Sequence, residues 1–183
     1  MGGMMVDPAV GLLLVCVVAL LFASAAIHKF RDLKLFDEIF AAYGVAGAIS
    51  RWRLAWLVPV LEFATGVGLL SDMTRPYAAA LGALLLLSYA IAIGINLRRG
   101  RRDLACGCGG PDERRPIASW MVWRNVLLAL VVLSTLAPWS GRPLGVTDGV
   151  TVIFGVLTLA LIYLCVDQLM GYLQRVAQLR GIR

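Results

Sequence analysis

Two cysteines separated by one glycine, Cys106 and Cys108, are the residues of this sequence best suited to chemistry. Two thiols at this spacing can close a small strained disulfide ring, and Gly107 permits the unusual backbone dihedrals that such a ring needs. A strained disulfide is more oxidising and exchanges more readily than a structural one. Alternatively, the two cysteines are incidental in a glycine-rich turn. Nearby guanidinium groups favour the nucleophilic thiolate, namely those of Arg101, Arg102, Arg114 and Arg115.

A metal site is a second interpretation of the same thiols. Structural zinc prefers four ligands, and the chain offers only this pair and the distant His28, so a second copy would have to complete the site. We therefore predict no metal. The other cysteines, Cys16 and Cys165, lie at different depths of two apolar stretches and are expected to be packing residues. A resolving role for Cys165 is an alternative.

The composition defines the surroundings in which these thiols must work. Of 183 residues, 60% are hydrophobic and 15% are charged, and the mean hydropathy is +0.83. Soluble domains carry about 25% charged residues. The chain has too little polar surface to cover a globule in water, so lipid must be the solvent.

Apolar stretches long enough to cross a bilayer determine the predicted fold. A spanning helix needs roughly 20 apolar residues, and lipid leaves no other way to satisfy the backbone of a single segment. The sequence therefore predicts an all-α integral membrane bundle of about five transmembrane helices in a single domain, residues 1–183. The first stretch lacks a basic flank and a cleavage site and is expected to be a retained helix. The predicted spans are 8–27, 54–70, 77–97, 120–139 and 146–170.

The basic residues predict the orientation of this bundle. Cytoplasmic loops carry an excess of Lys and Arg, and here these residues crowd the loops after the first and third spans and the C-terminal tail. The N-terminus is therefore placed outside and the C-terminus in the cytoplasm. Topology and attraction to anionic lipids explain the net charge of +6, so nucleic acid is not expected as a partner. The residues on the cytoplasmic side are Lys29, Arg31, Lys34, Arg51, Arg53, Arg98, Arg99, Arg101, Arg102, Arg114, Arg115, Arg175, Arg180 and Arg183, against Arg75 and Arg142 outside.

This orientation conflicts with a simple oxidising role for the Cys106 loop. Thiols on the cytoplasmic side are usually kept reduced. Either the pair exchanges electrons with a cytoplasmic thiol system, or the loop folds back into the bundle, or the charge rule misleads. The preceding segment, 28–53, carries apolar residues at helical spacing and is expected to lie as an amphipathic helix at the interface.

Polar residues inside the spans are the remaining candidates. Glu62 lies near the middle of the second span, and an intramembrane carboxylate usually marks a paired or functional position. Arg124 and His28 are its predicted partners. The pair is either a structural bridge or part of a proton pathway. Arg124 and Asn125 also supply hydrogen-bond donors at the depth of the Cys106 loop, for the loop itself, a quinone oxygen or a lipid phosphate.

These features together resemble the methylamine utilization protein MauE family, itself distantly similar to DoxX-like bundles. The resemblance implies a role in methylamine metabolism, in the processing or disulfide formation of a dehydrogenase subunit, beside a thioredoxin-like partner. It extends over about residues 10–170. The residues that carry it are His28, Lys29, Pro59, Glu62, Thr65, Gly66, Arg99, Gly100, Arg101, Cys106, Gly107, Cys108, Arg124 and Asn125.

The leading hypothesis is a multi-pass thiol–disulfide redox protein of a bacterial-type inner membrane. Cys106 and Cys108 exchange with a cysteine-containing client, while Arg124, Asn125 and His28 position the pair. No cofactor is assigned, although a quinone would suit polar groups beside thiols within lipid. The alternative is a non-catalytic membrane scaffold or assembly factor, which has no need of cycling thiols. A transporter ranks third, because the chain shows no repeated halves and no pair of broken helices.

Overall fold

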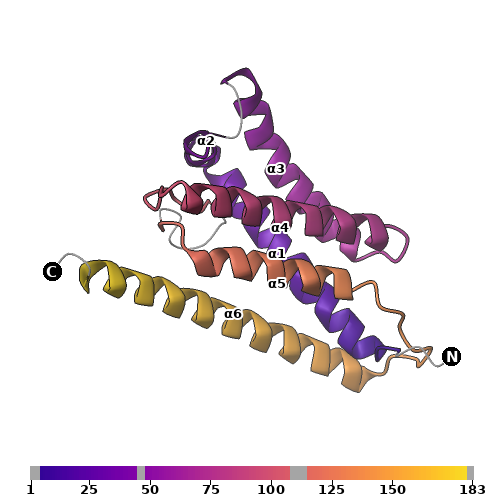
Figure 1. Cartoon of the computed structure of the whole chain (residues 1–183). Coiled ribbons are helices and arrows are strands. Elements are labelled where there is room, and N and C mark those ends of the chain that lie inside the picture. Colours follow the sequence, from indigo (N-terminus) through magenta and orange to yellow (C-terminus); the bar gives the residue numbers. More distant parts are fainter. Residues whose placement is uncertain (1–4, 45–47, 108–114, 181–183) are drawn as a thin grey trace. The chain divides into compact units, whose positions relative to one another are not determined.

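The computed structural model describes residues 5–44, 48–107 and 115–180, which form helices joined by short connections (Figure 1). Among these residues there is no β-strand, and only isolated bridges join Val6 to Trp139 and Ala105 to Pro116. The all-α prediction is confirmed. The helices are α1 (Pro8–Arg31), α2 (Leu33–Ala42), α3 (Ala48–Leu69), α4 (Arg75–Arg98), α5 (Ser119–Ser134) and α6 (Val146–Arg180).

Three of the described helices are long and apolar enough to cross a membrane, namely Pro8–Arg31, Arg75–Arg98 and Val146–Ala177. Two shorter apolar helices, Ala55–Leu69 and Ser119–Ser134, coincide with the other predicted spans. At about 1.5 Å of rise per residue, α5 is about 24 Å long, less than the roughly 30 Å of a hydrocarbon core. The count of five spans and the orientation of the termini therefore stay predictions.

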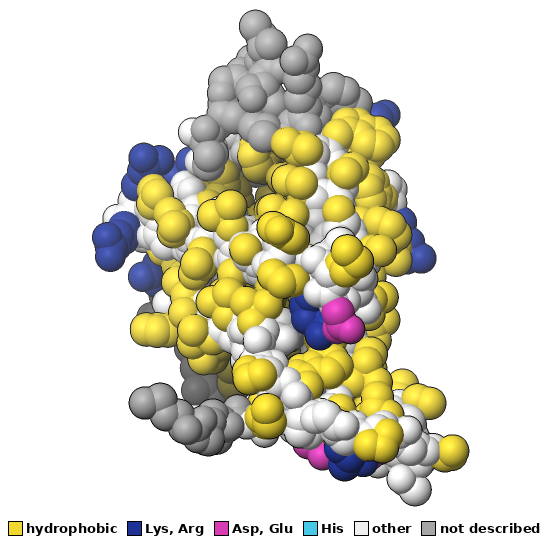
Figure 2. Space-filling model, turned by 90° about the vertical axis from the view of Figure 1, so that its right-hand side faces the viewer, with side chains coloured by type: hydrophobic (Ala, Val, Ile, Leu, Met, Phe, Trp, Pro, Cys, Tyr) yellow, Lys and Arg dark blue, Asp and Glu magenta, His cyan; other side chains and the backbone are white. Residues whose placement is uncertain are grey.

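The exposed surface is apolar over long stretches. In the most apolar window of α6 only 6% of the residues are buried, although the mean hydropathy of that window is 2.5. Side chains such as Phe154, Leu161 and Ile162 are more than half exposed. Figure 2 shows hydrophobic side chains over most of the visible surface, with charged groups in small clusters. A surface of this kind is suited to lipid rather than water.

The described chain divides into two compact units, Leu14–Ala137 and Met1–Leu13 with Pro138–Arg183. In the second unit, the backbone N–H of Val6 donates to the carbonyl of Pro138 at 2.9 Å. Arg142 donates to the carboxylates of both Asp7 and Asp148, at 3.0 and 2.9 Å. The hydrogen bond from Arg142 lowers the pKa of Asp7. These bonds connect the N-terminal segment to the start of α6.

In the larger unit, α4 packs against both α3 and α5, and α2 packs against α3. Glycines let these helices approach closely. A Cβ atom on Gly66 of α3 would lie 3.0 Å from the carbonyl oxygen of Ala19 in α1. A Cβ atom on Gly82 of α4 would lie 2.9 Å from a methyl carbon of Thr65. Small residues at crossings are the usual way in which helices pack tightly within lipid.

The amphipathic helix expected over the segment 28–53 covers only α2, because α1 continues to Arg31 and α3 begins at Ala48. Asp32 caps α2 by accepting a hydrogen bond from the backbone N–H of Leu35 at 3.0 Å. Its Phe36 and Ile39 are buried, whereas Lys34 and Glu38 are exposed. Helix α2 thus presents one apolar face to α3 and to the loop that carries the cysteine pair.

Candidate functional site

The loop that carries Cys106 is anchored on the larger unit by a short antiparallel pairing. The backbone N–H of Cys106 donates to the carbonyl of Arg115 at 3.0 Å, and that of Ile117 donates to the carbonyl of Leu104 at 2.9 Å. Leu104 and Ile117 are 6% and 2% exposed. They belong to one apolar cluster with Ile39, Tyr43, Ile93 and Met121. The described part of the loop therefore packs against the helices of the larger unit, whereas the side of the membrane on which it lies stays a prediction.

Cys106 is disulfide-bonded, whereas Cys16 and Cys165 are free. Cys108 lies outside the described residues. Next to the bonded cysteine, Gly107 has a φ of +62°, a conformation that glycine adopts without steric cost. A Cβ atom at that position would lie 2.9 Å from Cγ2 of Ile39. The glycine of the motif is thus required by both the backbone conformation and the close approach of α2.

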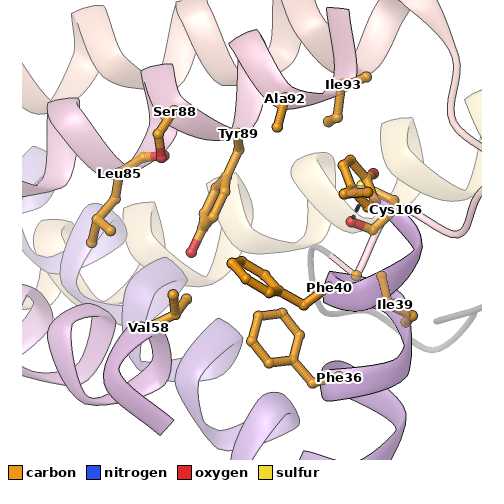
Figure 3. A pocket seen from close by; sticks show the side chains of 12 residues that line it. Phe36, Ile39, Phe40, Val58, Leu85, Ser88, Tyr89, Ala92, Ile93 and Cys106 are labelled. Atoms are coloured by element: carbon orange, nitrogen blue, oxygen red, sulfur yellow. Dashed lines mark hydrogen bonds between the residues drawn. The ribbon is translucent and has the colours of Figure 1, made fainter. Parts of the chain in front are cut away.

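A cavity of about 230 Å³ adjoins the bonded cysteine. Figure 3 shows Tyr89 of α4 and the phenyl rings of α2 directed toward one another, with Cys106 at one end of the group. The hydroxyl of Tyr43 donates to the carbonyl of Cys106 at 3.4 Å. Burial raises the pKa of Tyr43 to about 12, so it stays a donor at neutral pH. The lining residues are Phe36, Ile39, Phe40, Tyr43, Val58, Leu85, Ser88, Tyr89, Ala92, Ile93, Cys106 and Gly107.

A buried ion pair is connected to this cavity through the lining residue Tyr89. The Nζ atom of Lys29 lies 2.6 and 2.8 Å from the two carboxylate oxygens of Glu62. The hydroxyl of Tyr89 donates to Oε1 of the same carboxylate at 2.7 Å. Lys29 also lies 5.5 Å from the ring centroid of Phe36 and 5.4 Å from that of Tyr89. The charges are therefore matched and fully enclosed, as buried charges must be.

Glu62 pairs with Lys29 and Tyr89, and not with Arg124 or His28 as the sequence suggested. Helix α1 extends to Arg31, so Lys29 lies inside the helix rather than in the loop that the charge pattern indicated. The guanidinium of Arg124 lies 5.2 Å from the ring centroid of Trp120, one turn earlier on α5. The prediction of a bridge between α3 and α5 through Glu62 is wrong.

The remaining predicted site residues occupy different places. Asn125 is 3% exposed and donates to the carbonyl of Met121 on its own helix at 2.9 Å. His28 is half-buried and lines a small second cavity of about 10 Å³ with Lys29, Asp32 and Gly107, among others. The structure thus brings His28 near the cysteine loop. Within the described residues, no group of three or more His, Cys, Asp or Glu residues could hold a metal ion.

The sequence analysis did not predict Lys29 and Tyr89 as the partners of Glu62. Helical spacing contained a signal for Lys29, because it lies three and seven residues after Ala26 and Phe22, which are both buried. A lysine on the buried face of a membrane helix requires an acidic partner, and Glu62 is the carboxylate inside an apolar stretch nearby in sequence. Tyr89 had no comparable signal among the apolar residues of α4.

Comparison with known proteins identifies the family. A model of the methylamine utilisation protein MauE family matches residues 7–139. The chain belongs to the MauE family. It is 32% identical to methylamine utilization protein MauE of Paracoccus denitrificans, over 93% of this chain and 92% of that protein. The MauE proteins of Methylophilus methylotrophus and Methylorubrum extorquens are 31% and 32% identical, over 94% and 75% of this chain and 92% and 77% of their own lengths. No solved structure matches the chain.

Proposed function

We propose that this MauE-family protein is a membrane thiol–disulfide redox protein that serves methylamine utilisation. Cys106 and Cys108 are the exchanging pair, and they accept electrons from the thiols of a client protein directly or through a thioredoxin-like carrier. The client thereby gains a disulfide that it needs for maturation. The protein works in the inner membrane of a bacterial-type cell.

The observation that carries this proposal is the state of Cys106. It is disulfide-bonded in a loop whose two ends are held by backbone hydrogen bonds and an apolar cluster. Its neighbour Gly107 adopts a backbone conformation that most other residues reach only with strain. A purely structural crosslink between cysteines as close in the sequence as Cys106 and Cys108 would close a very small loop and constrain the unfolded chain little. An exchanging pair explains the cysteines better.

The anchored loop also supports exchange. Cys106 is half-buried rather than enclosed and lines the cavity. Thiol–disulfide exchange requires access to a sulfur atom. The arginines near the loop in the sequence, Arg101, Arg102, Arg114 and Arg115, supply positive charge that favours a thiolate.

Thiol trapping in intact cells tests the proposal. In a Cys16→Ala/Cys165→Ala background only Cys106 and Cys108 react with maleimides, and membrane-permeant and impermeant reagents are compared with and without prior reduction. We expect labelling only after reduction, and the access of the impermeant reagent reports which side the loop faces.

The Cys106→Ser/Cys108→Ser variant tests the activity itself. It should insert normally but fail to support oxidation of the client. The Cys16→Ala/Cys165→Ala variant is its matched control and should retain activity. Thiols that are always free, or full client maturation without the pair, would instead support the non-catalytic assembly factor.

A further inference from the structure

We infer that the cavity beside Cys106 is the binding site of a lipid-soluble quinone, which reoxidises the cysteine pair. The inference rests on the proposed thiol–disulfide function and names its electron acceptor. It follows from the lining, size and position of the cavity and from its connection to the buried ion pair.

The chemistry of the lining excludes the common charged acceptors. None of the residues that line the cavity carries a formal charge. Nicotinamide and flavin nucleotides carry phosphates, which proteins bind with basic side chains or clustered backbone N–H groups. Apolar walls with aromatic rings are instead suited to a neutral planar ring, which prefers offset or edge-to-face contacts with such side chains.

The size of the cavity matches one ring. Its volume of about 230 Å³ lies below the roughly 300–1,000 Å³ of sites for drug-sized ligands. A substituted quinone ring fits such a volume, while its isoprenoid tail must lie outside. The rim of the cavity provides that exit, because Ser88 is exposed on α4 beside Leu84, Leu87 and Ile91, which are 65%, 40% and 61% exposed. A tail that leaves beside these side chains enters lipid.

Polar atoms in the wall match the quinone oxygens. The Tyr89 hydroxyl donates to Glu62, so its oxygen remains available to accept a hydrogen bond from a quinol hydroxyl. The Tyr43 hydroxyl, bonded to the Cys106 carbonyl at the long distance of 3.4 Å, is a donor that a quinone oxygen can attract. Phe36 and Phe40 of α2 line the same cavity, and Figure 3 shows their rings close to that of Tyr89.

The overall reaction balances without a further reactant. The S–H bonds of Cys106 and Cys108 break and one S–S bond forms. The two electrons pass to the quinone, and two protons, the equivalent of those released by the thiols, reach its two oxygens to give the quinol. The Tyr89 hydroxyl, held by its hydrogen bond to Glu62, accepts a hydrogen bond from the quinol hydroxyl that forms on the nearer oxygen.

The test uses the full-length protein in nanodiscs of quinone-free phospholipid, with a ubiquinone of one isoprenoid unit as the probe. We measure saturable binding by the oxidised protein and single-turnover quinol formation by the reduced protein, and expect one quinol per chain. Ala92→Phe fills the cavity from α4 and should weaken binding and slow reduction at least about 10-fold. Its matched control, Ala80→Phe, adds the same ring to an exposed position of the same helix and should bind and react like the wild type.

Tyr89→Phe keeps the ring and removes the hydroxyl. It should weaken binding about 5-fold, which corresponds to a hydrogen bond of about 1 kcal/mol. Absence of saturable binding, equal rates in Ala92→Phe and wild type, or equal competition by a saturated fatty acid would each overturn the inference, the last by showing a groove for acyl chains.

A parallel measurement separates the inference from the proposed function. The oxidised protein is mixed with a peptide dithiol in the absence of quinone. Exchange with the peptide but no reaction with the quinone leaves the proposed function standing and removes the quinone site. Failure to react with either removes both.

Discussion

Lys29 and Glu62 lie 33 residues apart in the sequence and form an ion pair in which both side chains are almost fully buried, with exposed fractions of 3% and 2%. Breaking one partner of such a pair leaves an uncompensated buried charge and typically costs about 3–5 kcal/mol. We therefore expect Lys29→Met and Glu62→Gln each to destabilise the protein by about that amount. Thermal unfolding in detergent, followed by tryptophan fluorescence, measures the effect.

The double variant gives the decisive comparison for this pair. Lys29→Met with Glu62→Gln removes both charges together, and its free energy of unfolding should exceed that of either single variant. Glu38→Gln, at an exposed position of α2, is the control and should change stability by less than about 0.5 kcal/mol. Strictly additive losses in the double variant would show that the two side chains do not interact.

Gly107 is expected to tolerate no side chain. Gly107→Ala places a Cβ atom 2.9 Å from Ile39 Cγ2. The alanine must also adopt the φ of +62° that the glycine has, which lies in the left-handed region. The left-handed backbone conformation alone costs a residue with a side chain about 1–2 kcal/mol. Gly44 is the control for this backbone cost, because it has a φ of +67° with nothing near the added Cβ atom. Thermal unfolding should show a larger loss for Gly107→Ala than for Gly44→Ala; equal losses would mean that Ile39 moves aside freely.

Gly82 is expected to determine the distance between α3 and α4. A Cβ atom there would lie 2.9 Å from Thr65 Cγ2 and 3.0 Å from Cζ of Phe22. Overpacking of this kind costs about 1–3 kcal/mol, so Gly82→Ala should lower the midpoint of thermal unfolding. Gly94, further along α4, has open space around the added atom. Gly94→Ala should therefore leave the midpoint unchanged or raise it, because alanine stabilises a helix relative to glycine by up to about 1 kcal/mol. The opposite order of the two variants would contradict the packing described.

Tyr43 gives a prediction at alkaline pH. Its pKa is raised to about 12 in the folded protein, against about 10 in an unfolded chain. Because the folded-state pKa is the higher one, the associated stability is fully present below about pH 10 and is lost as the pH rises toward 12. The difference in unfolding temperature between wild type and Tyr43→Phe should be constant at neutral pH and shrink across that window. Tyr77→Phe, at a position that is 79% exposed, is the control and should show no such change.

Several features of the site follow from the sequence alone. The mean hydropathy and the apolar stretches predict an all-α membrane protein, because lipid leaves helices as the way to satisfy the backbone of each segment. The spacing of Cys106 and Cys108 predicts thiol chemistry without any knowledge of the fold. Family resemblance rests on the same local motifs. These features depend on composition or on the order of residues along the chain, so they can be read directly from residue types and spacing.

Tertiary structure alone decided which residues meet. Glu62 was identified as a costly buried charge, but its partners depend on where α1 ends and on how α4 packs against α3. Helix α1 continues past its apolar stretch to Arg31, which places Lys29 rather than Arg124 beside the carboxylate. The cavity is formed jointly by α2, α3, α4 and the Cys106 loop. Residue spacing fixes which side chains share a face of one helix, whereas contacts between helices depend on crossing positions and on glycines such as Gly66 and Gly82, and no single segment encodes them.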